Sequence, residues 1–277
     1  MMALLSSATL LKAPRRIRFR VISAKKRSTM LSQEAEDVSK DVDRDVQAIV
    51  WAMGLHNIRR YFHQRFWEEE TRVSEFAARI ESFPRLESVA EHSWHLAYIC
   101  MLLAPRHPDL DQAKVLRIAT VHDILEIISG DDSPIGRDGT GRTTHAFNQE
   151  VAQQRAAAEE LALAKYLERM PADSVREHSD LLNEYRDVRS QEAKFVKSVD
   201  KLQTLVFVLL KKRGDMEDKH LRFTLSYSEK GISYFPPLED HFRNLQNRIL
   251  EQAAACRRTS VAELITQLFG TQLSFWQ

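Results

Sequence analysis

Four ionisable side chains lie at sequence positions where core residues are expected. His92, His122 and Asp200 each share a helical face with apolar residues, and Asp123 directly follows His122. Taken singly, each histidine is typical of a core histidine with an ordinary partner, Asp123 of a helix-surface charge, and Asp200 of an acid paired with a nearby lysine. Taken together, two imidazoles and two carboxylates need a shared partner, because burying them unpaired is costly.

A divalent cation would satisfy all four groups at once, because the ligands share its charge. A mixed set of imidazoles and carboxylates suits Mn, Fe, Co, Ni or Zn better than Ca, and it differs from a zinc site built on thiolates. Four protein ligands around an octahedral ion would leave two positions for water or substrate, as catalysis requires. The sequence therefore predicts a catalytic metal site between packed helices.

The helix that carries His92 is the best-defined element of the sequence. It is predicted over residues 88–105, where Ser88 and Glu91 form a capping box and Pro105 marks the far end. The capping box satisfies backbone N–H groups that would otherwise lack partners at the start of the helix, so this boundary is well specified.

A second helix is expected over residues 111–130, where a glycine ends it. Glu126 follows His122 by four residues and Asp123 by three, so one helix face would present all three side chains toward one centre. Asp131 comes directly after the terminating glycine, at the rim of the expected pocket. The alternatives are an exposed helix charge for Glu126 and an ordinary turn aspartate for Asp131.

The rest of the chain reads as helices separated by loops. Strict alternation of polar and apolar residues is nearly absent, so we expect an all-α fold. Two short helices are expected in the last 40 residues. The other predictions are helical patterns over 46–62, 73–83, 147–170 and 181–214, the last as one helix or two, and loops over 130–141 and 227–237.

Composition sets limits on the class of protein. The chain has 277 residues, of which 43% are hydrophobic and 29% charged, as in a soluble globular protein of one long domain or of one domain with appendages. Its net charge of +1 gives no general attraction to nucleic acid. Two cysteines cannot build a disulfide framework, which favours a reducing intracellular compartment. No run approaches the ~20 apolar residues of a membrane span.

The first 33 residues differ from the remainder of the chain. They contain eight Lys or Arg and no acidic residue, a composition typical of an organelle transit peptide. The alternative is a disordered basic tail, and Met30 could be an internal start. The expected location is therefore intracellular, either cytoplasmic or organellar.

The residues singled out above resemble the H…HD…D pattern of HD-domain metal-dependent phosphohydrolases. Three stretches, ESVAEHSW, HDILEIISGDDSP and EAKFVKSVDKL, are similar to three blocks of the 5′-deoxynucleotidase branch, and the HD-x-x-E-x-x-x-x-D spacing is intact. The resemblance covers about residues 80–215. It implies an HD-domain helical bundle there, with a helical segment over 34–79 before it and a helical extension over 216–277 after it.

The resemblance implies a phosphomonoesterase that hydrolyses (deoxy)nucleoside 5′-monophosphates to nucleoside and phosphate, and a homodimer. It assigns one divalent metal (Mn, Co, Fe, Ni, Zn or Mg) to the four residues described first. Glu126 would be the catalytic carboxylate and Asp131 would lie at the substrate. Other HD-superfamily activities remain open, namely a phosphodiesterase, an alarmone hydrolase or a di-iron oxygenase, as does a non-catalytic metal-binding scaffold.

The sequence departs from the family at one place. The family often carries an Arg and a Trp some 15 residues before the first His, where the Arg contacts phosphate, but residues 73–87 contain no Trp. Arg79 and Arg85 are the cations available there for a phosphate, and either could instead be a solvated arginine. Arg137 and Arg142 of the glycine-rich loop could close over a phosphate, although a flexible surface loop is the simpler interpretation.

Overall fold

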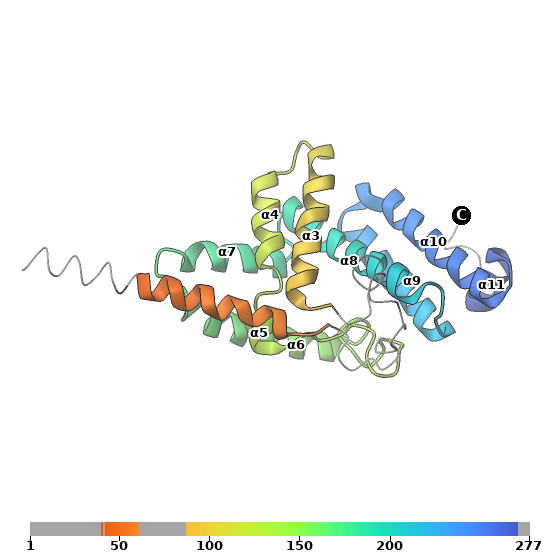
Figure 1. Cartoon of the computed structure of the whole chain (residues 1–277), viewed down its shortest axis with the longest axis horizontal. Helices are drawn as coiled ribbons and strands as arrows, with labels where there is room; N and C mark the ends of the chain where they lie inside the picture. The colour runs from red at the N-terminus through yellow and green to blue at the C-terminus, as the bar shows by residue number, and fades with distance from the viewer. Residues whose placement is uncertain (1–39, 41, 61–86, 271–277) are drawn as a thin grey trace, which may run out of the picture. The chain divides into compact units, whose positions relative to one another are not determined.

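The structure is a computed structural model that describes residues 40, 42–60 and 87–270 (Figure 1). The segments predicted as a basic leader (1–33) and as a helix (73–83), together with Arg79 and Arg85, lie outside the described residues. Within those residues all repetitive structure is helical, apart from one isolated bridge between Arg59 and Ser88. The all-α prediction is therefore confirmed.

The labelled helices all belong to one compact unit, Arg44–Gln277. None of those in the described part of the chain is both long and apolar enough to cross a bilayer. After a helical stretch over 42–52, the elements in chain order are η1 (Met53–Asn57), α3 (Val89–Leu103), η3 (Ala104–Arg106), α4 (Gln112–Val121), α5 (Glu126–Ser129), α6 (Gln149–Leu167), α7 (Val175–Arg186), α8 (Gln191–Lys212), α9 (Asp218–Tyr234), η4 (Pro236–Leu238), α10 (Glu239–Arg257) and α11 (Val261–Phe269).

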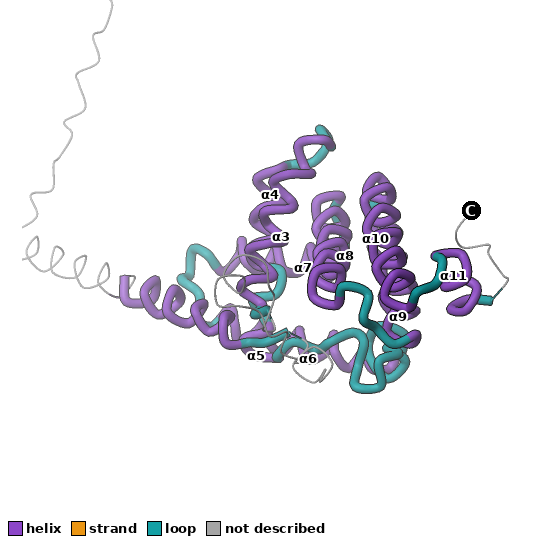
Figure 2. Tube along the Cα trace, turned by 45° about the vertical axis from the view of Figure 1, so that its right-hand side comes forward, coloured by secondary structure: helices purple, strands orange, loops and turns teal. Residues whose placement is uncertain are grey.

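Helix α8 is the central element of this unit. It packs against α3, α4, α7, α9 and α10, and Figures 1 and 2 show α3 beside α4 and α8 beside α9. Phe195 and Phe207 of α8, Leu96 of α3 and Ile118 of α4 are almost completely buried between these helices. Burial of one such side chain contributes about 1.5–3 kcal/mol, so the core fixes α8 and holds Asp200 in place.

The start of α3 is built as the sequence predicts. The Ser88 hydroxyl accepts a hydrogen bond from the Glu91 amide at 3.3 Å, and the Glu91 carboxylate accepts one from the Ser88 amide at 2.8 Å. The neighbouring backbone pairs with residues 58–60: the Arg60 amide donates to the Glu87 carbonyl at 3.0 Å and the Val89 amide to the Ile58 carbonyl at 2.9 Å. This pairing brings Arg60 beside the first turn of α3.

The predicted helix over 111–130 is broken in the middle. It begins next to Asp111 as expected, with the Asp111 side chain as its cap, but α4 ends at Val121, four residues of tight turn follow, and α5 starts at Glu126. In the turn the amide of residue 124 donates a hydrogen bond to the carbonyl of residue 121. The amide of residue 126 donates one to the carbonyl of residue 123, and both bonds are 3.0 Å long. Bonds of this i→i+3 type wind the chain more tightly than an α-helix. Two sequence neighbours, His122 and Asp123, can therefore reach the same partner.

In the second half of the chain the structure contradicts two predictions, the loop over 227–237 and the shortness of both C-terminal helices. It also decides whether residues 181–214 form one helix or two. Residues 181–214 form parts of two helices, α7 and α8, separated at residues 187–190. Residues 227–234, predicted as loop, belong to α9, because their apolar side chains pack into the core while Gly231 makes room for the Phe242 ring. The described part of the last 40 residues holds two helices, as predicted, but α10 has 19 residues and is not short.

The glycine-rich segment after α5 is a folded loop that packs on α9. Ile135 and Ala146 of the loop form a small apolar cluster with Phe223 and Tyr227 of α9. Gly141 has a φ of 72°, and a Cβ at this position would lie 2.4 Å from the Phe223 ring, so both its conformation and its contact require glycine. The loop is therefore held against α9.

Candidate active site

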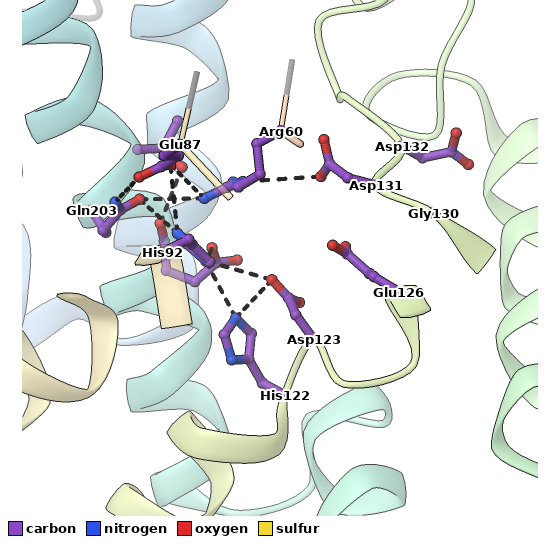
Figure 3. A network of polar contacts seen from close by, with 12 residues as sticks. Arg60, Glu87, His92, His122, Asp123, Glu126, Gly130, Asp131, Asp132 and Gln203 are labelled. Carbon is purple, nitrogen blue, oxygen red and sulfur yellow. Dashed lines mark hydrogen bonds and ion pairs between the residues drawn. The ribbon is translucent and has the colours of Figure 1, made fainter. Parts of the chain in front are cut away.

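The structure brings together the four residues that the sequence singles out. His92 Nε2 lies 3.2 Å from Asp200 Oδ1 and 3.5 Å from Asp123 Oδ2. His122 Nε2 lies 2.9 Å from the same Asp123 oxygen and 3.3 Å from His92 Nε2 (Figure 3). The ligand atoms of His92, His122 and Asp123 all lie within 4.8 Å of one another and could hold a metal ion.

The tautomers of the two histidines fit a cation at this point. His92 Nδ1 lies 2.8 Å from Gln203 Oε1, and His122 Nδ1 lies 2.9 Å from the Ala119 carbonyl oxygen. Both partners accept hydrogen bonds, so each ring donates from a protonated Nδ1 and turns its Nε2 atom toward the centre. Two imidazole lone pairs and two carboxylates converge in the protein interior, which is a donor set that a divalent cation matches.

The charges at this centre are already set for binding a cation. Burial by itself would raise the pKa of Asp123, but His122 and then His92 outweigh burial and hold that pKa below its usual range. Burial is likewise outweighed at Asp200, whose pKa is held well below normal by Lys201 and His92. Both carboxylates therefore stay ionised near neutral pH.

Asp200 also has the lysine partner that a purely structural interpretation expects. Lys201 Nζ donates to Asp200 Oδ2 at 2.8 Å, while Asp200 Oδ1 faces His92. The two oxygens of one carboxylate thus face two different groups. The lysine pair therefore does not remove Asp200 from the centre.

Glu126 lies beside this centre at the start of α5. It is buried, its Oε2 atom has no hydrogen-bond partner among the described residues, and its Oε1 atom lies 4.0 Å from Arg155 Nη2. Burial raises the pKa of Glu126 well above its usual value; Asp123 and Asp131 add to this, and Arg60 and Arg155 offset it only in part. A buried carboxyl group of this kind is suited to holding and transferring a proton.

A buried hydrogen-bond network, absent from the sequence predictions, supports His92 (Figure 3). Gln203 accepts from His92 through Oε1 and donates through Nε2 to Glu87 Oε2 at 3.1 Å. Glu87 Oε1 accepts from Arg60 Nη1 at 3.1 Å, and Arg60 Nε lies 3.9 Å from Asp131 Oδ1. The network therefore runs from His92 to Asp131, and Asp131 faces Arg60.

A cavity of about 220 Å³ opens beside the centre. Helices α6, α7, α8 and α9 and the loop after α5 contribute to its wall. The lining includes the acids Asp123, Glu126, Glu159 and Asp200, the cations Arg155, Arg186, Lys197, Lys201 and Lys230, and His122, His145, Tyr185, Tyr227 and Tyr234.

Several of these residues were not found by sequence reasoning. Gln203 carried a usable signal, because it follows Asp200 by three residues on the same buried face of α8. Arg60 carried none, since it reaches Glu87 across 27 residues of chain. Arg137 and Arg142, considered for phosphate, are exposed and do not line the cavity.

A comparison with family profiles identifies the class of protein. The profile described as HD domain matches residues 75–234, which is more than half of the chain. This protein belongs to the HD domain family.

Curated relatives are similar to a part of the chain. The 5′-deoxynucleotidase HDDC2 of Xenopus laevis is 32% identical over 138 residues, which are 48% of this chain and 61% of that protein. HDDC2 of Homo sapiens is 29% identical over 122 residues, 44% and 53% of the two chains, and 5′-deoxynucleotidase hdd1 of Schizosaccharomyces pombe is 30% identical over 122 residues, 43% and 55%. The chain spans between half and about three fifths of the length of these relatives.

A solved structure shares the fold. The crystal structure of a predicted metal-dependent phosphohydrolase from Magnetospirillum magnetotacticum superimposes with a TM-score of 0.54 at 23% identity. The match covers 76% of this chain and 93% of the other. At this identity the likeness shows the fold alone.

Proposed function

We propose that this chain is a metal-dependent phosphomonoesterase that hydrolyses nucleoside 5′-monophosphates, deoxynucleotides among them, to nucleoside and phosphate. The observation that carries the proposal is the convergence of two imidazoles and two carboxylates beside a cavity whose wall is rich in cations. Membership of the HD domain family and relatives named 5′-deoxynucleotidase support the same reaction and substrate class.

In this proposal His92, His122, Asp123 and Asp200 hold one divalent cation. The chemistry that the cation supplies when bound is Lewis acidity, which polarises the phosphate and makes water a better nucleophile. The chain contributes the orientation of its donors. Gln203 and the Ala119 carbonyl fix the two imidazole rings so that both Nε2 atoms face the centre.

Glu126 is proposed to move a proton during hydrolysis. Its raised pKa favours the protonated form of the carboxyl group, and that proton can pass to the leaving 5′ oxygen. Arg60 and Asp131 lie close enough to Glu126 to influence its pKa. We place the substrate phosphate near Glu126, which lines the cavity.

The direct test is a substrate panel. The protein is loaded separately with Mn²⁺, Co²⁺, Mg²⁺ and Zn²⁺, and phosphate release is measured from ribo- and deoxynucleoside 5′-monophosphates, with 3′-monophosphates and a phosphodiester as controls. We expect release from 5′-monophosphates and little from the controls. Inactivity on every monophosphate with every metal would contradict the proposal, and turnover of the diester alone would favour a phosphodiesterase.

Replacing Glu126 with Gln tests the proton-transfer role. The amide keeps the size of the side chain but has no carboxyl proton to transfer, so we expect turnover to fall about 10²–10⁴-fold. Metal content, measured by plasma mass spectrometry, is expected to stay at the wild-type level. Activity that survives in Glu126→Gln would remove this residue from the mechanism.

A further inference from the structure

Five cations line the cavity beside the candidate metal centre, and three of them form ion pairs with acids. Lys201 pairs with Asp200 at 2.8 Å, Arg155 Nε with Glu159 at 2.7 Å, and Arg186 Nη1 with Glu160 at 2.8 Å. Two further cations, Lys197 on α8 and Lys230 on α9, line the same cavity. Among the residues that the structure describes, no carboxylate forms an ion pair with either lysine.

Lys197 is held against an aromatic ring instead of an acid. Its Nζ atom lies 3.9 Å from the centre of the Tyr185 ring, and that ring packs edge-on against His122 with 5.4 Å between ring centres. Burial, followed by the nearby charge of Lys201, lowers the pKa of Lys197 to about 8. A cation–π contact compensates only part of the lost hydration of an ammonium group, so this position disfavours the charge in the absence of an anion.

Lys230 stands in a similar environment on the neighbouring helix. Its Nζ atom donates to the Ala146 carbonyl and lies 5.1 Å from the centre of the Phe147 ring and 5.5 Å from that of Tyr227. Burial and Lys201 lower its pKa as well. One carbonyl and two ring faces leave the ammonium group free to donate further hydrogen bonds into the cavity.

The pKa of His145 shows that several of these cations act at one place in the cavity. It lies in the loop after α5 and lines the same cavity. Burial lowers its pKa to about 3, and Arg155, Lys201, Lys230 and Lys197 all contribute in the same direction. The imidazole is therefore neutral at physiological pH and adds no charge of its own, while four cations from three helices surround it.

We propose that Lys197 and Lys230 form an anion subsite that binds the phosphate group of the substrate and, after hydrolysis, inorganic phosphate. The proposal rests on the proposed function and names the residues that hold its substrate. The cavity has a volume of about 220 Å³, which gives room for a phosphate group. A phosphate would supply the counter-charge that the two lysines lack and accept hydrogen bonds from both.

The test measures binding of inorganic phosphate to the Mn²⁺-loaded protein by calorimetry. Lys197→Met and Lys230→Met are each expected to weaken binding about tenfold or more, because each removes a charge-assisted hydrogen bond. Lys197→Arg and Lys230→Arg keep the charge and should retain most of the affinity. Lys194→Met is the matched control, since it removes a lysine one turn earlier on α8 that does not line the cavity.

Thermal unfolding separates a binding role from a structural one. Lys197→Met should fold and melt at a higher temperature than wild type without phosphate, because it removes a half-buried cation that has no ion-pair partner among the described residues. A residue kept for structure would show the opposite change. A lower melting temperature for Lys197→Met would therefore overturn the proposal for that residue.

The failure of this inference can be told apart from the failure of the proposed function. The subsite is overturned if wild type does not bind phosphate. It is also overturned if the double variant Lys197→Met/Lys230→Met binds phosphate as tightly as wild type. Phosphate binding that depends on both lysines in a protein that hydrolyses no monophosphate supports the subsite and rejects the phosphatase.

Discussion

Gln203 connects the candidate metal centre to the buried network around it. Its amide orientation is fixed from the other side, because Nε2 donates to Glu87 and Oε1 lies 3.4 Å from Arg60 Nη1. With the amide so placed, only Oε1 faces His92, and the ring must carry its proton on Nδ1. One side chain therefore determines which nitrogen of His92 is offered to a cation.

Replacement of Gln203 by Leu is expected to weaken metal binding about 10–100-fold, because His92 loses the acceptor that fixes its tautomer and orientation. The measurement is a chelator competition with Mn²⁺ or Co²⁺. Gln252→Leu, on α10, is the control that changes the same residue type elsewhere. Equal affinity in wild type and Gln203→Leu would show that the ring is positioned by packing alone.

The depressed pKa of Lys197 predicts a pH dependence of stability. Near pH 7 Lys197 is protonated in both the folded and the unfolded chain, so the whole cost of burying the charge is present. Between about pH 8 and 10.5 the folded protein has released this proton while the unfolded chain retains it, so stability from this group rises with pH. The groups that act on Lys197 from α6 and α8 are Lys201, Asp200, Glu159 and Arg155.

Denaturant unfolding of wild type and Lys197→Met across pH 7–10 checks this dependence. All other titrating groups are common to the two proteins, so their contributions cancel in the difference between the two free energies of unfolding. We expect Lys197→Met to be the more stable protein at pH 7 and the difference to shrink as the pH rises. A difference that stays constant across this range would contradict the lowered pKa.

At the scale of elements, the N-terminus of α3 couples helix stability to the site. The capping box at Ser88 and Glu91 fixes the first turn, and His92 is the next residue along the helix. Helix α11 has the same device at Ser260 and Glu263, far along the chain from the centre. The molecule therefore contains its own control for the effect of a cap.

Ser88→Ala and Ser260→Ala are each expected to lower the free energy of unfolding by about 1 kcal/mol. Only Ser88→Ala should also weaken metal binding, because fraying of its helix displaces His92. Chemical denaturation and metal titration on both variants provide the comparison. A loss of metal affinity in Ser260→Ala of the same size would indicate a general effect of destabilisation.

The helices were predictable where their signals are local and less so where packing decides. The α3 cap and the start of α4 near Asp111 depend on a few adjacent residues, and both predictions are correct. The break between α4 and α5 follows no glycine or proline, so the 111–130 segment looked like one continuous helix. Residues 227–234 looked like loop because Gly231 weakens a helical pattern, yet close packing against Phe242 requires that glycine.

At the scale of the whole molecule, the site combines segments that the sequence keeps far apart. The centre could be predicted because His92, His122 and Asp200 interrupt apolar faces. The cavity wall could not, since Lys197 and Lys230 look like ordinary surface lysines until α8 and α9 pack together. The homodimer and the organellar location implied at the sequence level stay predictions, and light scattering would decide the first.

The most direct test of the account is the metal content of the protein. Wild type is saturated with Mn²⁺ or Co²⁺, freed of loosely bound ions and analysed by plasma mass spectrometry. We expect one ion per chain, lost in Ala variants of the four proposed ligands, His92, His122, Asp123 and Asp200, and retained in His107→Ala. A wild-type chain that retains no divalent ion, or an Asp200→Ala chain that retains a full equivalent, would contradict the account.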